Sequence, residues 1–148
     1  MKYTEAERGR VFISRLEDGD IIPDAIEELA EKEEINSAVV FFLGGADKNS
    51  KVVVGPEETP GKKIKSIITE LEGISEAVGI GTIFSDEEGR PKLHLHAAFG
   101  HKDKTITGCT RAGVTTWLIG EVIIMELINH NSLRKLDIER DLRLLKVD

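Results

Sequence analysis

The chain has 148 residues, a length that suits a single domain with a hydrophobic core of its own. Hydrophobic residues make up 40% and charged residues 32%, which excludes an intrinsically disordered chain. Acidic residues outnumber basic residues by 27 to 20, and the net charge of −7 excludes a broad basic surface for nucleic-acid phosphates. A single cysteine excludes an internal disulfide.

No secretory signal is visible at the N-terminus, whose first ten residues are charged and lack an apolar segment. The longest apolar run, residues 117–128, contains Gly120, Glu121 and Glu126 and is shorter than the roughly 18 apolar residues of a spanning helix. We therefore expect a cytoplasmic protein without membrane contact.

The chain opens with a predicted strand over residues 11–16, followed by a turn and an amphipathic helix. Asp20 is the predicted N-cap, and Pro23 lies in the first turn, where a missing N–H removes no hydrogen bond. The helix is expected to end near Glu33. Helical spacing predicts one apolar stripe, made of Ile22, Ala25, Ile26, Leu29 and Ala30.

Beyond the helix, the period of the apolar residues becomes that of strands. β-Branched and alternating segments predict strands over residues 37–43, 51–54, 64–72, 78–84, 93–99, 106–109 and 115–128, with turns at residues 57–61 and 86–90. Gly44-Gly45 is expected to end the first of these strands. One early helix and about seven strands predict an α+β domain with a mainly antiparallel β-sheet.

His94 and His96 carry the clearest chemical signal. Alternate residues of a strand point to the same face, so the two imidazoles lie together on the face opposite the apolar one. If residues 101–104 form a tight turn, His96 lies directly opposite Cys109 on the next strand. Two imidazoles and a thiolate are good ligands for zinc and related metals, and three protein ligands leave a fourth position for water or substrate.

A plainer interpretation stays open at this point. In that case His94 and His96 would lie on an exposed or interface face without binding a metal, and Cys109 would be a small buried hydrophobic residue. A register slip of one residue would turn Cys109 to the other face of the sheet. His101 and His130 are expected to be solvated loop residues.

Glu121 and Arg111 are the candidates for a catalytic role. Glu121 lies inside an apolar strand, so it would act either as a general base or as an interface carboxylate paired with an arginine. Arg111 lies two residues from Cys109 and would bind a small anionic ligand or pair with a nearby acid.

Gly89-Arg90-Pro91 matches the centre of an AT-hook, but three acidic residues precede it, and a turn is the expected structure. The glycines of the chain form neither a dinucleotide-binding fingerprint nor a P-loop.

Several short motifs follow one another in an ordered set: Arg10-Val11, the turn at Gly19, Ala38-Val39-Val40 leading to Gly44, residues 70–75, His94-Leu95-His96, residues 107–113 and Gly120-Glu121-Val122. The set resembles the PPC domain, the plants-and-prokaryotes-conserved domain. This domain accompanies AT-hooks in plant nuclear regulators and usually stands alone in bacteria and archaea. The resemblance covers residues 8–147 as a single domain and implies an α+β fold that assembles as a homotrimer.

The resemblance also implies a histidine-rich site that holds a metal, expected to be zinc, in some prokaryotic members. The family pattern is H-x-H followed by G-G-H-L. His94 and His96 match its first part, Cys109 stands in place of the third histidine, and Thr107-Gly108 replaces the two glycines. Since a thiolate is also a zinc ligand, His94, His96 and Cys109 are the expected ligands.

Residues 115–128 are apolar on both faces, more than a single solvated sheet needs. A face buried between the subunits of a trimer would account for this. The sequence thus predicts a stand-alone PPC-domain protein, homotrimeric and cytoplasmic, with a zinc site and a binding or regulatory role. The first alternative is a small metal-dependent hydrolase or lyase, with Glu121 as base and Arg111 as anion clamp. The second is a DNA-associated regulator, which the net charge of −7 disfavours.

Overall fold

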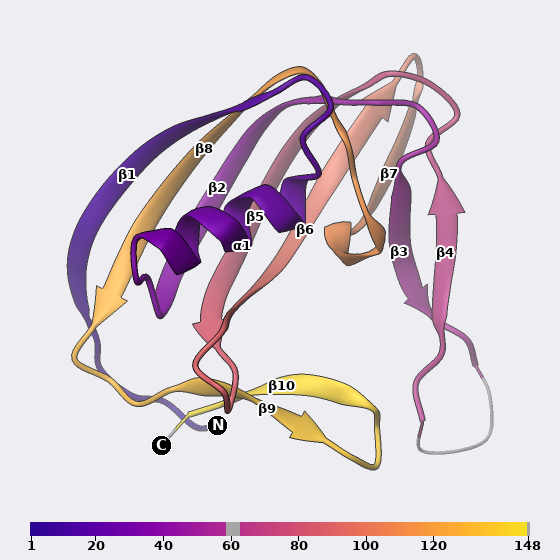
Figure 1. Ribbon diagram of the computed structural model, residues 1–148. Coiled ribbons are helices and arrows are strands. Elements are labelled where there is room, and N and C mark those ends of the chain that lie inside the picture. The colour runs from indigo at the N-terminus through magenta and orange to yellow at the C-terminus, as the bar shows by residue number, and fades with distance from the viewer. Residues whose placement is uncertain (59–62, 148) are drawn as a thin grey trace.

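The computed structural model describes residues 1–58 and 63–147, which contain one α-helix and two antiparallel sheets (Figure 1). Helix α1 spans Ile22–Lys32, and the short 3-10 helix η1 spans Thr110–Ala112. The strands are β1 (Glu7–Glu17), β2 (Ser37–Ala46), β3 (Lys51–Pro56), β4 (Ser66–Glu70), β5 (Ser75–Ser85), β6 (Pro91–His101), β7 (Lys104–Cys109), β8 (Thr116–Ile128), β9 (Leu133–Asp137) and β10 (Leu142–Lys146).

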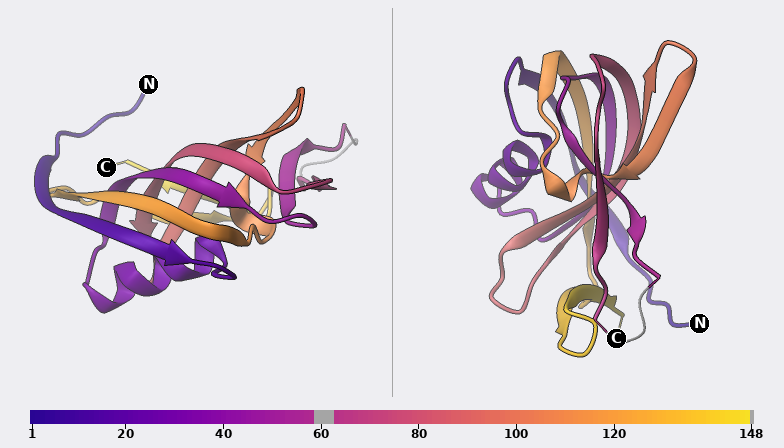
Figure 2. Two further views of the ribbon diagram at one scale, coloured as in Figure 1. Left: turned by 90° about the horizontal axis from the view of Figure 1, so that it is seen from above. Right: turned by 90° about the vertical axis from the view of Figure 1, so that its right-hand side faces the viewer.

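Eight strands form one sheet in the order β1-β8-β2-β5-β6-β7-β3-β4, and each neighbouring pair is antiparallel. Strands β9 and β10 form a separate hairpin below the sheet (Figure 1). Helix α1 lies against one face of the twisted sheet, while most of the opposite face has no helix or strand of the described residues packed over it (Figure 2). The predicted α+β fold with a mainly antiparallel sheet is therefore confirmed.

The hydrophobic core lies between α1 and the sheet. Ile22, Ile26 and Ala30 of the predicted apolar stripe are buried, and Ala25 and Leu29 pack against them as partly buried residues. The sheet contributes buried side chains from its central strands, among them Val40, Phe42, Leu95, Val122 and Ile124. No helix of the described ranges is long and apolar enough to cross a membrane.

Several predicted element boundaries are wrong. The N-cap of α1 is Ile21, without a side-chain hydrogen bond, because the Asp20 carboxylate instead accepts the backbone N–H of Glu17 at 2.8 Å. Strand β2 continues through Gly44-Gly45 to Ala46, since a shift in its register with β8 accommodates the two glycines.

The structure also contains two strands beyond the predicted ranges. The C-terminal tail, in which leucines alternate irregularly with charged residues, forms β9 and β10. The turn predicted at residues 57–61 lies partly outside the described residues.

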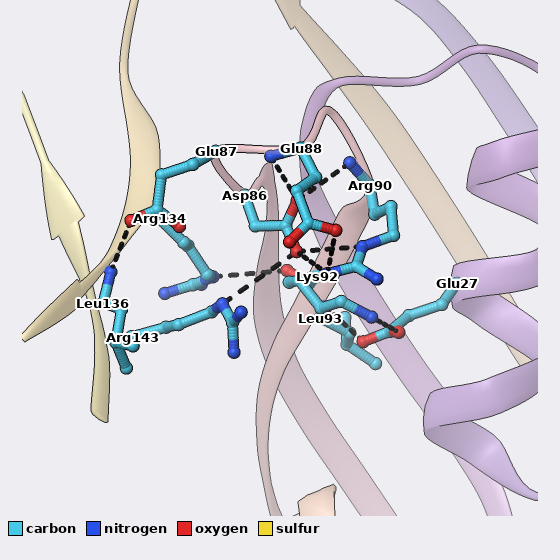
Figure 3. A network of polar contacts seen from close by, with 10 residues as sticks. All are labelled: Glu27, Asp86, Glu87, Glu88, Arg90, Lys92, Leu93, Arg134, Leu136 and Arg143. Atoms are coloured by element: carbon cyan, nitrogen blue, oxygen red, sulfur yellow. Dashed lines mark hydrogen bonds and ion pairs between the residues drawn. The ribbon is translucent and has the colours of Figure 1, made fainter. Parts of the chain in front are cut away.

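Asp86, in the turn between β5 and β6, is the centre of a polar network (Figure 3). Its buried carboxylate accepts the backbone N–H groups of Glu88 and Arg90, both at 3.0 Å, and two bonds from the Arg90 guanidinium. Burial by itself raises the pKa of Asp86, but these hydrogen bonds outweigh it and hold the pKa below its usual value. The neighbouring Glu87 accepts the backbone N–H of Leu136, which ties β9 to this turn.

We expect Asp86→Asn to lower the free energy of unfolding at pH 7 by about 1–3 kcal/mol, because the amide lacks the charge that Arg90 binds. The pKa of Asp86 is lower in the folded protein than in the unfolded chain. Its contribution is therefore complete above about pH 4 and is lost as the pH falls through the folded-state value.

Urea unfolding of wild type and variant at pH 7 and pH 3 measures this difference, which should shrink at pH 3. Glu88→Gln is the matched control, since Glu88 pairs with the same arginine from an exposed position. Equal stability of Asp86→Asn and wild type at pH 7 would show that the network does not stabilise the fold.

Candidate metal centre

The three predicted ligands lie on the hairpin of β6 and β7. His101 pairs with Lys104 at its tip, where Lys102 adopts a left-handed backbone conformation with φ of 54°. From this tip the register runs without a break to His96 opposite Cys109. The predicted cross-strand pairing is confirmed, because a tight turn determines the register of the strands it joins.

The donor atoms of the three side chains converge. The Nε2 atoms of His94 and His96 are 3.0 Å apart, with the two rings edge to face, and the donor atoms of His94, His96 and Cys109 all lie within 4.8 Å of one another. Zinc bonds of about 2.0–2.3 Å separate tetrahedral ligands by about 3.3–3.6 Å. Small side-chain rotations therefore bring the three donors to coordination distance, and the residues fit a divalent metal ion with bond lengths like those of zinc.

His94 is in the protonation state that metal binding requires. Part of its ring is exposed, but the surrounding strands desolvate it enough to lower its pKa to about 4, and the positive charges of Arg134 and Arg111, together with His96, act in the same direction. The His94 ring is therefore neutral at pH 7, and a neutral imidazole nitrogen is the form that binds a metal.

Cys109 is only 2% exposed because β3 lies directly beside it, with Val53 as its cross-strand partner. This close approach depends on Gly108. A Cβ atom at position 108 would overlap the carbonyl oxygen of Val53 and lie 2.6 Å from the side chain of Val52. Glycine at this position allows β3 to cover the thiol on one side.

Arg134 of β9 lies beside the site and was not predicted. It is only 6% exposed, and its guanidinium donates to the carbonyl oxygen of Lys92 (Figure 3). It also donates to the hydroxyl of Thr82, the residue directly opposite His94. No carboxylate forms an ion pair with it within residues 1–58 and 63–147. Burial lowers the pKa of Arg134, and the negative charges of a Cys109 thiolate and of Glu27 oppose that change.

Of the two catalytic candidates, the structure places only Arg111 near the three proposed ligands. Glu121 lies on β8 opposite Leu43 and Arg15, three strands from β6 and thus about 14 Å across the sheet from the histidines. Arg111 instead lines the same pocket as the three ligands, and it donates a hydrogen bond of 2.8 Å to the hydroxyl of Ser66.

The two remaining histidines lie outside the convergent group. The prediction that both are solvated loop residues is wrong for His101, and for His130 only its loop position is confirmed. His101 ends β6, is half-buried, and places Nδ1 2.7 Å from the carbonyl oxygen of Ile74. His130 does lie in a loop, yet it is half-buried, packs edge to face on Phe84 and accepts the backbone N–H of Ser132.

Comparison with known proteins identifies one family. The sequence profile of the Plants and Prokaryotes Conserved (PCC) domain, the family also written PPC, matches residues 3–128. None of the curated proteins compared with the chain matches it significantly.

Several solved structures have the same fold. A metal-containing protein from Archaeoglobus fulgidus is 23% identical, with a TM-score of 0.83 over 97% of this chain and 98% of that one. A plant- and prokaryote-conserved protein from Pyrococcus horikoshii is also 23% identical, with a TM-score of 0.82 over 99% and 97% of the two chains. A proposed DNA-binding protein from Ralstonia eutropha is 22% identical, with a TM-score of 0.69 over 92% and 90%.

We expect Gly108→Ala to lower the free energy of unfolding by about 1–3 kcal/mol, because the added methyl group forces β3 away from β7. Denaturant unfolding measures the change. Gly100→Ala on β6 is the control, since its Cβ would meet nothing closer than the carbonyl oxygen of Glu76 at 3.8 Å. Equal effects of the two substitutions would contradict the close approach at Gly108.

Proposed function

Because the chain belongs to the Plants and Prokaryotes Conserved domain family, we propose that it is a metal-binding member with a binding or regulatory role, and that its ligands are His94, His96 and Cys109. The observation that carries this proposal is the convergence of the three donor atoms, which the unbroken register of one hairpin produces. The relative from Archaeoglobus fulgidus, described as metal-containing, supports it.

The proposed metal is zinc. Two imidazole nitrogens and one thiolate are typical of zinc, while calcium and magnesium prefer oxygen ligands. Three protein ligands also leave a fourth position open, the arrangement of sites that bind an exchangeable ligand. A thiolate ligand is retained only where cysteine stays reduced, so the proposal includes a cytoplasmic location.

A binding role agrees better with the surroundings of the site than hydrolysis or elimination does. A general base must reach its proton directly or through one water molecule. Glu121 lies three strands away, and the described residues that line the pocket at the ligands include no carboxylate. A metal-dependent hydrolase or lyase with Glu121 as base is therefore not what the geometry favours.

DNA binding is likewise not part of the proposal, although the relative from Ralstonia eutropha is a proposed DNA-binding protein. The net charge of −7 opposes phosphate binding. The AT-hook-like tripeptide lies in a turn, where Gly89 has φ of 79° and Arg90 forms ion pairs with Asp86 and Glu88. That arginine is therefore not free to enter a minor groove.

We also propose that the protein is a homotrimer, held together by the uncovered face of the sheet. On this face Ile13, Ile123, Phe41 and Ile80 lie side by side in register on four neighbouring strands, and the row continues to His96. These four apolar side chains are 88%, 43%, 42% and 58% exposed. A contiguous apolar row of this kind is typical of an interface, and in a three-fold ring it would pack against a different surface of the neighbouring copy.

Protein purified without chelators is expected to contain about one metal ion per chain, measured by elemental analysis. His94→Ala and Cys109→Ser should each lose it, since removing a ligand weakens binding beyond the roughly 10- to 100-fold caused by loss of an outer partner. His130→Ala is the matched control and should keep the metal, because His130 packs on Phe84 away from the ligands. Metal-free wild type, or full metal content in His94→Ala, would refute the proposed site.

Leu43→Lys is expected to convert the trimer to monomers in size-exclusion chromatography with light scattering. Leu43 is 57% exposed beside the apolar row, and a lysine there faces Glu121 across the strands, so the subunit itself keeps its stability. Ile138→Lys is the control, because Ile138 is 81% exposed in the turn between β9 and β10. A monomeric wild type, or a trimeric Leu43→Lys, would show that this face is not the interface.

A further inference from the structure

A pocket of about 300 Å³ opens onto the three proposed ligands. His94, His96 and Cys109 all line it, so the coordination position that they leave open faces this pocket. The end of β3, from Val53 to Pro56, contributes an apolar part of the wall. The volume is at the lower limit for small-molecule sites, and it suits a ligand of only a few carbon atoms.

The pocket is positively charged in an acidic protein. Its lining includes Arg111 and no aspartate or glutamate among the described residues, while the chain as a whole carries −7. A divalent metal bound by two imidazoles and one thiolate adds a further positive charge, and the buried Arg134 lies close by. An anion is the ligand that compensates these charges.

Arg111 is held in place to bind such an anion. It belongs to η1, which follows Cys109 directly and is anchored where the Thr110 hydroxyl donates to the carbonyl oxygen of Leu95. The guanidinium donates one hydrogen bond to the hydroxyl of Ser66 and forms no ion pair with any residue that the structure describes. Its remaining N–H groups match the two oxygens of a carboxylate.

We propose that this pocket binds a small organic carboxylate, with one oxygen on the metal and hydrogen bonds from Arg111 to the carboxylate group. The inference rests on the proposed metal centre and adds the class of its ligand. The apolar wall at Val53, Val54 and Pro56 receives the carbon chain, which distinguishes a carboxylic acid from inorganic phosphate.

The test uses the full chain loaded with Co²⁺, whose visible absorption responds to a change of ligand. Propionate and inorganic phosphate are titrated separately at constant ionic strength. Propionate is expected to change the Co²⁺ spectrum in a saturable way and to bind more tightly than phosphate. Arg111→Gln, loaded to the same cobalt content, should raise the dissociation constant for propionate at least tenfold, and Arg111→Lys should raise it less.

Arg15→Gln is the matched control, because Arg15 lies on β1 at the opposite end of the sheet and pairs with Glu17. Unchanged propionate affinity in Arg111→Gln, or no spectral response of the loaded wild type, would overturn the inference while leaving the metal centre intact. A response to phosphate alone would overturn the assignment to carboxylates. Failure of the wild type to bind Co²⁺ would overturn the proposed metal centre itself.

Discussion

The register of the β6–β7 hairpin is the constraint on which the candidate metal centre depends. Antiparallel pairing places Cys109 directly opposite His96, and the alternation of side chains along β6 brings His94 to the same face. A shift of one residue would turn the thiol away and leave two imidazoles without a third donor. The register is set locally, because the connection is short and Lys102 adopts the left-handed conformation that such turns require.

The same register joins the site to the uncovered face of the sheet. Ile80 lies directly opposite His96, so the apolar row that crosses four strands ends at a proposed ligand. A second pocket, of about 460 Å³, lies at this junction and is lined by His94, His96, Ile80 and Thr82 among others. In the proposed trimer a partner subunit would cover the row beside the proposed metal site, and exclusion of water there would strengthen the electrostatic interactions of the site.

The period of the apolar residues was sufficient to predict a helix or strand where the segment buries a single face, as in the stripe of α1 and the alternating residues of β6. It was insufficient for Asp20, because the geometry of the loop decides which backbone N–H a carboxylate accepts. It also missed the continuation of β2 through Gly44-Gly45, where a register shift removes the break that two glycines suggest. The β9–β10 hairpin was missed because it packs at the end of the sheet, where few positions are buried and alternation is weak.

The sequence by itself determined the spacing of His94 and His96, the tight turn that sets Cys109 opposite His96, and the family to which the chain belongs. These features are local, or they depend only on the order of motifs along the chain. Only the tertiary structure decided that β3 covers the thiol beside Gly108, that Arg111 joins the pocket while Glu121 does not, and that Arg134 is buried next to His94. Such contacts join residues far apart in the chain. Their proximity follows from how the strands and hairpins pack, and this packing cannot be predicted from the spacing of motifs or the period of apolar residues.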